Sequence, residues 1–241
     1  MGFVYPFPFT CRPARFLRRL NRFVVEAELD GHAVSAHLHD PGRLTEILTP
    51  GAEIFLRPTE DARRRTPFTV VLARTDNVLV SVDTSLPNRF LDRCLRAGAL
   101  YEFRDYIVAR REAPYGRSRF DFHLMAAGVD MLLEVKSVTL VRDGRALFPD
   151  APTRRGARHV EELAAAARSG FVGTVLFLVQ RPDAAALSPH WAVDPAFARA
   201  LTHGFRQGLE ILAYTCRVSL DGMALDRRIP VDLHFDGEAP A

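Results

Sequence analysis

The pattern of apolar residues changes near residue 84, and this change divides the chain into two parts. In residues 1–83, short stretches with the alternation of β-strands are separated by turn signals such as Pro41-Gly42, Pro50-Gly51 and Asp76-Asn77. About five short strands so close together predict a small closed or partly closed barrel. We therefore expect residues 1–83 to form a small N-terminal OB-like β-barrel.

Residues 84–241 combine helical and strand patterns. A helix is predicted at PNRFLDRCLRAG, where apolar residues share one side and Gly98 ends the helix. Three strand candidates follow within residues 105–140, and then a helix ending at Gly170, an apolar strand, a further helix and a final strand. This order contains an αβββαβ core, and it predicts an α/β (α+β) domain with a mixed sheet.

The basic residues are almost all arginines and are unevenly spread. The chain has 32 Lys+Arg against 29 Asp+Glu, a net charge of +3, which permits an anionic partner without requiring one. The arginines either bind the phosphate backbone of a nucleic acid or form an ordinary solvated surface. Their clusters are Arg12 to Arg22, Arg63 to Arg65, Arg110 to Arg119, and Arg154 to Arg158.

The three cysteines, Cys11, Cys94 and Cys216, are far apart and form no C-x-x-C pair. This argues for a reducing compartment and against a disulfide scaffold or a cysteine zinc site. The first residues lack the order of a signal peptide, and no apolar run has the length of a membrane span. We therefore expect a cytoplasmic protein without a membrane partner, and leave open whether it forms a homodimer.

The only lysine of the chain, Lys136, lies in the second of two strand candidates joined by a short turn, SRFDFHLM and DMLLEVKSVTL. Side chains alternate faces along a strand. Alternation places Phe120, Phe122 and Leu124 on one face of the first strand and Arg119, Asp121 and His123 on the other; on the second it separates Leu133 and Val135 from Glu134 and Lys136. The hairpin is thus predicted to have an apolar side and a charged side.

Asp121 and Glu134 are equally far from the turn, so we expect their carboxylates to lie side by side. Like charges placed opposite each other are destabilising, and a divalent cation would reverse that effect. Mg²⁺ (or Mn²⁺) takes such oxygen ligands, and Lys136 would then hold the attacking water or stabilise charge on phosphorus. This is the D-x(n)-E-x-K arrangement of metal-dependent nucleases, and the alternative is a surface hairpin in which Lys136 merely forms a salt bridge.

Further candidates surround this pair. Glu102, after the first helix of this domain, is the candidate for a third carboxylate, with Glu112 as its competitor. Arg155 and His159 are four residues apart on a predicted helix and share a face, so they would approach a phosphate together, unless His159 only serves packing. His37 and His39 share a strand face, but a zinc site would need more ligands.

The chain resembles the sugar fermentation stimulation protein A (SfsA) family along nearly its whole length. The residues that carry the resemblance are AHLHDPGRLTEILTPG, DTSLPNRFL, YGRSRFDFHL, LLEVKSVTL, FPDAPTRRGARHVEEL and VQRPDA. The chain departs from the family pattern at HDPGRL, where many members carry Asn-Thr-Gly-Ser-Met.

The resemblance implies an N-terminal OB-type domain followed by a PD-(D/E)xK nuclease-like domain. It implies a metal site at Asp121, Glu134 and Glu102, with Lys136 as the catalytic lysine. Family-typical positions elsewhere are Asp40, Gly42, Arg43, Asp150, Thr153, Arg155, Gly156 and His159.

A DNA-binding protein with a Mg²⁺-dependent phosphodiesterase site is therefore the leading interpretation. The candidate nucleic-acid contacts are Arg18, Arg19, Arg43, Arg119, Arg155 and His159. One alternative is a DNA-binding transcriptional regulator of sugar metabolism whose nuclease-like core is catalytically idle. Another, less favoured, is a nuclease that acts on RNA or another phosphodiester.

Overall fold

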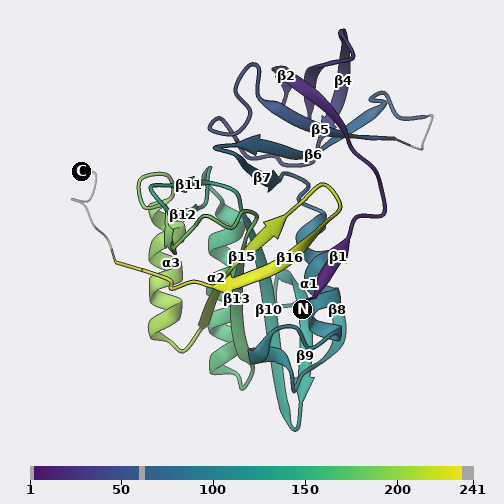
Figure 1. Ribbon diagram of the computed structural model, residues 1–241. Coiled ribbons are helices and arrows are strands. Elements are labelled where there is room, and N and C mark those ends of the chain that lie inside the picture. The colour runs from purple at the N-terminus through teal and green to yellow at the C-terminus, as the bar shows by residue number, and fades with distance from the viewer. Residues whose placement is uncertain (1–2, 60–62, 235–241) are drawn as a thin grey trace.

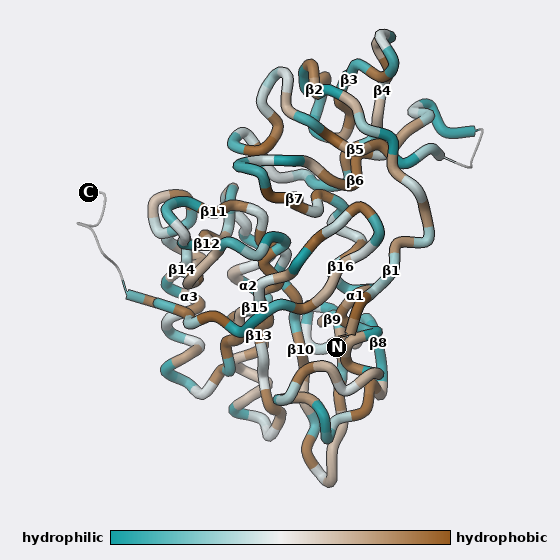
Figure 2. Tube along the Cα trace, viewed as in Figure 1, coloured by the Kyte–Doolittle hydropathy of each residue, from teal (hydrophilic) through white to brown (hydrophobic). Residues whose placement is uncertain are grey.

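The computed structural model describes residues 3–59 and 63–234, and it consists of a β-barrel beside a larger α/β domain (Figure 1). Apolar and polar residues alternate in part of the barrel, as in residues 25–29, and both brown and teal occur along the barrel strands in Figure 2. Val25, Ala27 and Leu29, for example, point into the barrel core, while the residues between them point out. The strands are β2 (Arg12–Asn21), β3 (Val24–Leu29), β4 (His32–Leu38), β5 (Glu53–Pro58), β6 (Phe68–Thr75) and β7 (Val78–Ser81).

Five of these strands close into a ring. β3 lies between β4 and β2, β2 pairs with β5, and β5 pairs with β6. A parallel pairing of β4 with β6, with Ala36 opposite Phe68, joins the two ends of the ring. β7 extends β6 as a hairpin outside it. The OB-like barrel predicted from the sequence is therefore confirmed, with β7 as an additional strand.

The second domain is built on a seven-stranded mixed sheet in the order β1-β16-β15-β13-β10-β9-β8. β10, β13 and β15 are parallel neighbours, and the remaining pairings are antiparallel. A small sheet of β11 (Val141–Arg142), β12 (Arg145–Phe148) and β14 (Ala186–Pro189) lies beside it. The large sheet consists of β1 (Val4–Pro6), β8 (Ile107–Tyr115), β9 (Ser118–Ala126), β10 (Val129–Val138), β13 (Val172–Val179), β15 (Glu210–Val218) and β16 (Gly222–Arg228).

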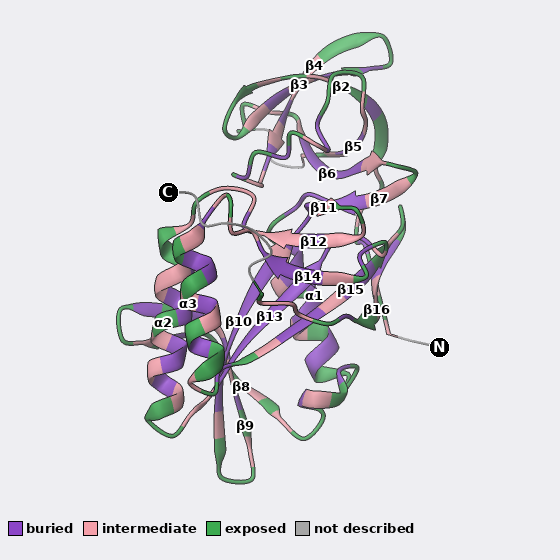
Figure 3. Ribbon diagram, turned by 90° about the vertical axis from the view of Figure 1, so that its left-hand side faces the viewer, coloured by how far each residue is buried: buried purple, intermediate pink, exposed green. Residues whose placement is uncertain are grey.

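Helices cover both faces of this sheet (Figure 3). α1 (Leu86–Arg96) packs on one face through Phe90 and Leu91, and α2 (Arg154–Arg168) and α3 (Pro195–Arg206) pack on the other. β13 runs between the two core clusters and is buried along almost its whole length. Complete burial of a side chain such as Phe90 contributes about 2–3 kcal/mol. The mixed α/β domain predicted from the sequence is confirmed.

The first strand belongs to the second domain, contrary to the division at residues 1–83 and 84–241. β1 pairs antiparallel with β16, with Val4 opposite Ala224. Phe3, Tyr5 and Phe7 contact the core cluster that also contains Met223. Aromatic residues at every second position of this segment pack into that core, so the chain enters the α/β domain before it forms the barrel.

The barrel and the α/β domain share an apolar core. Phe55, Val71 and Leu72 of the barrel lie in the same cluster as Phe90 of α1. A second connection is polar, where the Arg43 backbone N–H donates to Asp150 Oδ2 over 3.0 Å. A Cβ on Gly42 would lie 2.2 Å from that Asp150 oxygen, so only glycine allows this close approach. These contacts fix the barrel against the sheet.

Candidate functional site

The two carboxylates of the β9–β10 hairpin lie where its strands separate. The antiparallel ladder ends at Leu133 opposite Phe122, and the next positions are Glu134 and Asp121. There the Asp121 side chain takes the place of a backbone partner, and its Oδ2 accepts a hydrogen bond from the Val135 N–H at 2.8 Å. The predicted register of the hairpin is therefore confirmed.

One oxygen of Glu134 is fully engaged and the other is not. Glu134 Oε1 accepts from Lys136 Nζ at 2.7 Å and from His159 Nδ1 at 2.6 Å. Glu134 Oε2 is buried and has no hydrogen-bond partner. Since buried polar atoms are rarely left unpaired, this oxygen is suited to a ligand that the protein does not itself supply. Glu134 and Lys136 are only 5% and 9% exposed, so the salt bridge between them is buried and does not lie at the surface.

The alternation of β9 fails at one position. Phe122 and Leu124 lie in the core cluster beneath α1, as do Leu133 and Val135 of β10. Phe120 was expected on the same face but lies in the opposite cluster, and its ring is 5.7 Å from that of His159. The prediction for Phe120 was wrong because β9 no longer follows β10 beyond Phe122. The same departure leaves Asp121 free to turn toward α1.

The two carboxyl groups differ in pKa. Burial raises the pKa of Asp121 to about 7, and the charge of Glu134 adds to that increase. Burial also acts on Glu134, but the hydrogen bond from His159 and the charge of Lys136 outweigh it and lower the pKa of Glu134. Glu134 is thus ionised at neutral pH, while Asp121 is partly protonated in the metal-free protein. A bound cation would favour the ionised form of both.

His159 orients Glu134 from α2. Its Nδ1 lies against Glu134, and its Nε2 accepts a hydrogen bond from Arg155 Nε at 3.2 Å. A proton on Nδ1 satisfies both contacts. The helix places the two residues on one face, as predicted, because they are four positions apart. Thr153 accepts from the Gly156 N–H and caps the first turn that carries Arg155.

The side chain of Glu102 binds residues other than the carboxylate pair of Asp121 and Glu134. It lies on the short 3₁₀ helix η1 (Tyr101–Phe103) and accepts hydrogen bonds from Tyr214 Oη at 2.7 Å and Arg228 Nη1 at 2.8 Å. Within the described ranges, no group of three or more His, Cys, Asp or Glu side chains is spaced to hold a metal ion. The expected set of Asp121, Glu134 and Glu102 is therefore not assembled. The competitor Glu112 is exposed on β8.

Asn88 takes the place in which an acidic side chain was expected. It lies in the first turn of α1, and its Nδ2 donates to Asp121 Oδ1 at 2.6 Å. The sequence analysis did not select this residue, although it lies within DTSLPNRFL, a segment that carries the family resemblance. A neutral amide gave no signal in a search for acidic ligands.

The residues predicted to contact nucleic acid differ in whether their side chains already bind other groups of the protein. Arg18 pairs with Glu26. Arg19 donates all five of its N–H groups to backbone carbonyls, so it is structural. Arg43 and Arg119 are exposed, and no ion pair is found for either guanidinium among the described residues. Arg155 is exposed next to the carboxylates and uses its Nε on His159.

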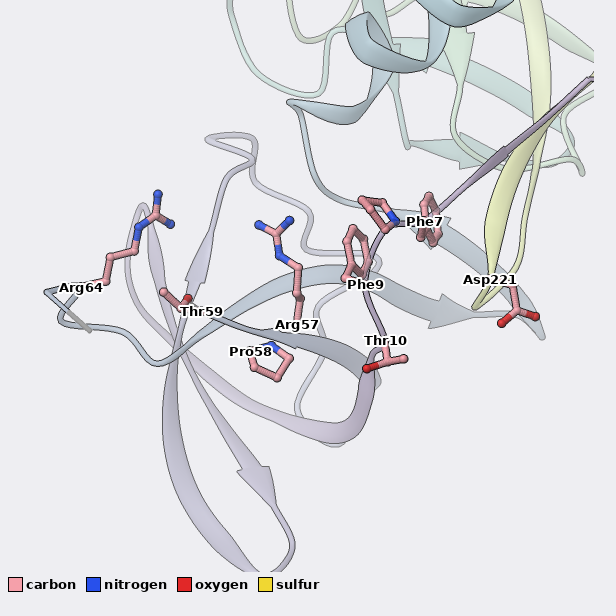
Figure 4. A pocket seen from close by; sticks show the side chains of 9 residues that line it. Phe7, Phe9, Thr10, Arg57, Pro58, Thr59, Arg64 and Asp221 are labelled. Carbon is pink, nitrogen blue, oxygen red and sulfur yellow. The ribbon is translucent and has the colours of Figure 1, made fainter. Parts of the chain in front are cut away.

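A cavity of about 1100 Å³ lies away from the carboxylates, between the barrel and the α/β domain (Figure 4). Phe9 lies against it, with its ring stacked on Phe7 at 5.2 Å and the Arg57 guanidinium 5.0 Å from its centroid. The guanidinium groups of Arg57 and Arg64 point to the same side (Figure 4). The two arginines that line the cavity, Arg57 and Arg64, thus both belong to the barrel. The cavity lies at the junction of the two domains, and neither Asp121 nor Glu134 lines it.

An OB-type barrel joined to a mixed α/β domain, with Asp and Glu-x-Lys on separating strands, defines a protein of the restriction-endonuclease-like class. Family models agree: residues 17–82 match "SfsA N-terminal OB domain" and residues 85–222 match "Sugar fermentation stimulation protein RE domain". The chain belongs to the SfsA family. None of the helices within residues 3–59 and 63–234 is long and apolar enough to cross a membrane.

Several relatives are similar to this chain along most of their length. A sugar fermentation stimulation protein homolog of Chloroflexus aurantiacus is 47% identical over 222 residues, which are 92% of this chain and 86% of the relative. One from Moorella thermoacetica is 45% identical over 207 residues, 85% of this chain and 89% of the relative. The solved structure of Pyrococcus furiosus SfsA in complex with Ca²⁺ has a TM-score of 0.87 and 26% identity, and it covers 95% of this chain and 98% of that one.

Proposed function

We propose that the protein binds DNA and hydrolyses phosphodiester bonds with Mg²⁺ or Mn²⁺ held at Asp121 and Glu134. The observation that carries the proposal is Glu134 Oε2, a buried carboxylate oxygen without a partner beside a second carboxylate. Hard oxygen ligands of this kind fit a divalent cation, which often uses only one or two protein carboxylates. The Ca²⁺ complex of Pyrococcus furiosus SfsA supports a divalent cation in this fold.

A metal ion at this site would supply Lewis-acid stabilisation of charge on the scissile phosphate and a more acidic water. The protein's own residues set the geometry. His159 and Asn88 orient the two carboxylates from opposite helices. Lys136 Nζ donates to Glu134 and keeps its remaining donors for an anionic group or a water molecule. Arg155, exposed at the same place, is suited to a phosphate oxygen.

Cleavage assays test the proposal. The purified protein is incubated with single- and double-stranded DNA and RNA in Mg²⁺, in Mn²⁺ and in EDTA, beside Asp121→Asn and Lys136→Ala. Asp130→Asn is the matched control, since Asp130 lies on β10 but contacts His123 instead of the carboxylate pair. We expect cutting in either metal ion, its loss in EDTA and in both site variants, and its retention in the control.

The alternative is a DNA-binding regulator with an idle core. The observation in its favour is that the part of the chain that is described assembles no third acidic ligand near Asp121 and Glu134. DNA binding without cutting of any substrate, in either metal ion, would overturn the hydrolase and leave this alternative.

A further inference from the structure

A row of aromatic rings lies on the barrel where the β2–β3 turn meets the end of β4; Phe23 is exposed, and His37 and His39 are half-buried. The Phe23 side chain is 45% exposed, and its ring stacks on that of His37 with centroids 6.4 Å apart and an interplanar angle of 21°. His37 contacts His39 edge to face at 4.5 Å. We call Phe23, His37 and His39 the aromatic platform. Exposed rings of this kind are what proteins use to hold unpaired bases.

Positive charge surrounds the aromatic platform. The Arg22 guanidinium lies 5.6 Å from the Phe23 ring centroid. Partial burial lowers the pKa of His37, and the neighbouring charges of His39 and Arg64 add to this effect. Within the described residues, neither Arg22 nor Arg64 nor Arg43 forms an ion pair with a carboxylate. These guanidinium groups are therefore available to phosphates, which follow the bases along a nucleic-acid strand.

Arg19 holds the aromatic platform in shape. Its guanidinium donates to the carbonyl oxygens of Arg22 at 2.6 Å and Asp40 at 3.0 Å, and to those of Gly42 at 2.6 Å and Arg43 at 3.0 Å. One half-buried cation thus ties the β2–β3 turn to the loop that follows β4. Ordering the rings before a ligand arrives removes part of the entropy loss of binding.

The aromatic platform is linked to the candidate active site by a hydrogen bond and the start of α1. The His39 carbonyl accepts a hydrogen bond from Thr84 Oγ1 at 3.2 Å. Thr84 lies two residues before α1, and Asn88 in the first turn of α1 contacts Asp121. Thr84 and Asn88 are four residues apart in the chain, which is a span of at most about 14 Å, so a short length of strand would connect the rings with the carboxylates.

We propose that the aromatic platform stacks the unpaired bases of single-stranded DNA and leads that strand to Asp121 and Glu134. Bases in a duplex are stacked on each other, and their faces are closed to protein side chains, so rings select single strands. This inference names the substrate class of the proposed nuclease and rests on that proposed function. The stack contributes affinity without sequence preference, because every base has an aromatic face.

Binding measured without cleavage tests this inference. Fluorescence anisotropy with a labelled oligothymidylate and with a duplex of equal length is recorded in EDTA, for the wild type, Phe23→Ala, Phe23→Trp and Phe205→Ala. Phe205 on α3 is the matched control, a phenylalanine that is 56% exposed and outside the aromatic platform. Circular dichroism checks that each variant is folded.

We expect Phe23→Ala to weaken single-strand binding roughly tenfold and duplex binding less than about twofold. Phe23→Trp should restore single-strand binding, and Phe205→Ala should leave it unchanged. Equal losses on both DNA forms, no difference between Phe23→Ala and Phe205→Ala, or no binding of single-stranded DNA by the wild type would each overturn the inference. An oligouridylate of the same length is the third probe, and a loss confined to it would overturn the assignment to DNA.

The cleavage assays separate this inference from the proposed function. Cutting that needs Asp121, together with single-strand binding that ignores Phe23, would leave the nuclease and remove the aromatic platform. Binding that depends on Phe23, without cutting of any substrate, would support the aromatic platform and contradict the nuclease.

Discussion

Asn88 on α1 donates a hydrogen bond of 2.6 Å to Asp121 on β9, and this amide ties the helix to the carboxylate pair. Asn88→Asp would place a third carboxylate at the site. Without a metal ion, we expect this variant to be less stable, because like charges meet in a buried place. With a divalent cation, we expect tighter binding than in the wild type. Urea unfolding in EDTA and calorimetric titration with Mn²⁺ measure the two effects.

The control for this prediction is Asn88→Ala, which removes the hydrogen bond without adding charge. Both variants should lose stability in EDTA, but only Asn88→Asp should gain affinity for Mn²⁺. Equal Mn²⁺ affinities in the two variants would contradict a metal site at Asp121.

Lys136→Arg retains the positive charge but replaces a compact ammonium with a planar guanidinium in a site that is 9% exposed. If Lys136 acts on the substrate, we expect the cleavage rate to fall by about 100-fold or more, the usual effect of removing one stabilising donor. The wild-type rate in Lys136→Arg would assign the lysine a purely electrostatic role. Thermal unfolding of the variant, recorded in parallel, shows whether any loss of rate reflects loss of fold.

His159→Ala removes one of the two donors that hold Glu134 Oε1. Residues that orient a metal ligand change metal affinity about 10–100-fold when they are replaced. We expect a loss of that size for Mn²⁺ in His159→Ala, together with roughly 1–3 kcal/mol of stability, because a buried carboxylate loses a partner. His159→Gln keeps a donor and should recover part of the affinity. A matching affinity in His159→Ala and the wild type would mean that His159 serves packing alone.

The hairpin register and the positions of Glu134 and Lys136 could be predicted because both follow from the period-2 alternation of strands and from a short turn. Phe120 and Asn88 could not, because each depends on where β9 leaves β10, and that separation is set by tertiary packing. Glu102 was misplaced for a related reason. Sequence distance from α1 cannot show that Tyr214 and Arg228, more than a hundred residues away, take up its oxygens.

The half-buried Asp40 at the junction of the two domains predicts a pH dependence of stability. Burial raises its pKa from 3.8 to about 6, and the charge of Asp150 adds to this. Because the folded pKa lies above the unfolded value, the protonated carboxyl stabilises the fold at low pH, and this contribution is lost as the pH rises through about 6. We expect Asp40→Asn to remove a pH-dependent difference of at most about 3 kcal/mol between pH 4 and 7. Urea unfolding of both proteins across this range measures it, and parallel curves would contradict the prediction.

Gly42→Ala probes the same junction by size instead of charge. The added Cβ would lie 2.2 Å from Asp150 Oδ2 and 2.8 Å from Asp40 Oδ1, so these side chains or the barrel loop must shift. We expect a loss of about 1–3 kcal/mol in the free energy of unfolding, as for other overpacked sites. In the double variant Gly42→Ala/Asp150→Ala, the methyl group has room, so its loss should be smaller than the sum of the two single losses by about 1 kcal/mol or more. Strictly additive losses would show that Gly42 does not depend on Asp150, and the domains would then be held together by the shared apolar core around Phe55 and Phe90.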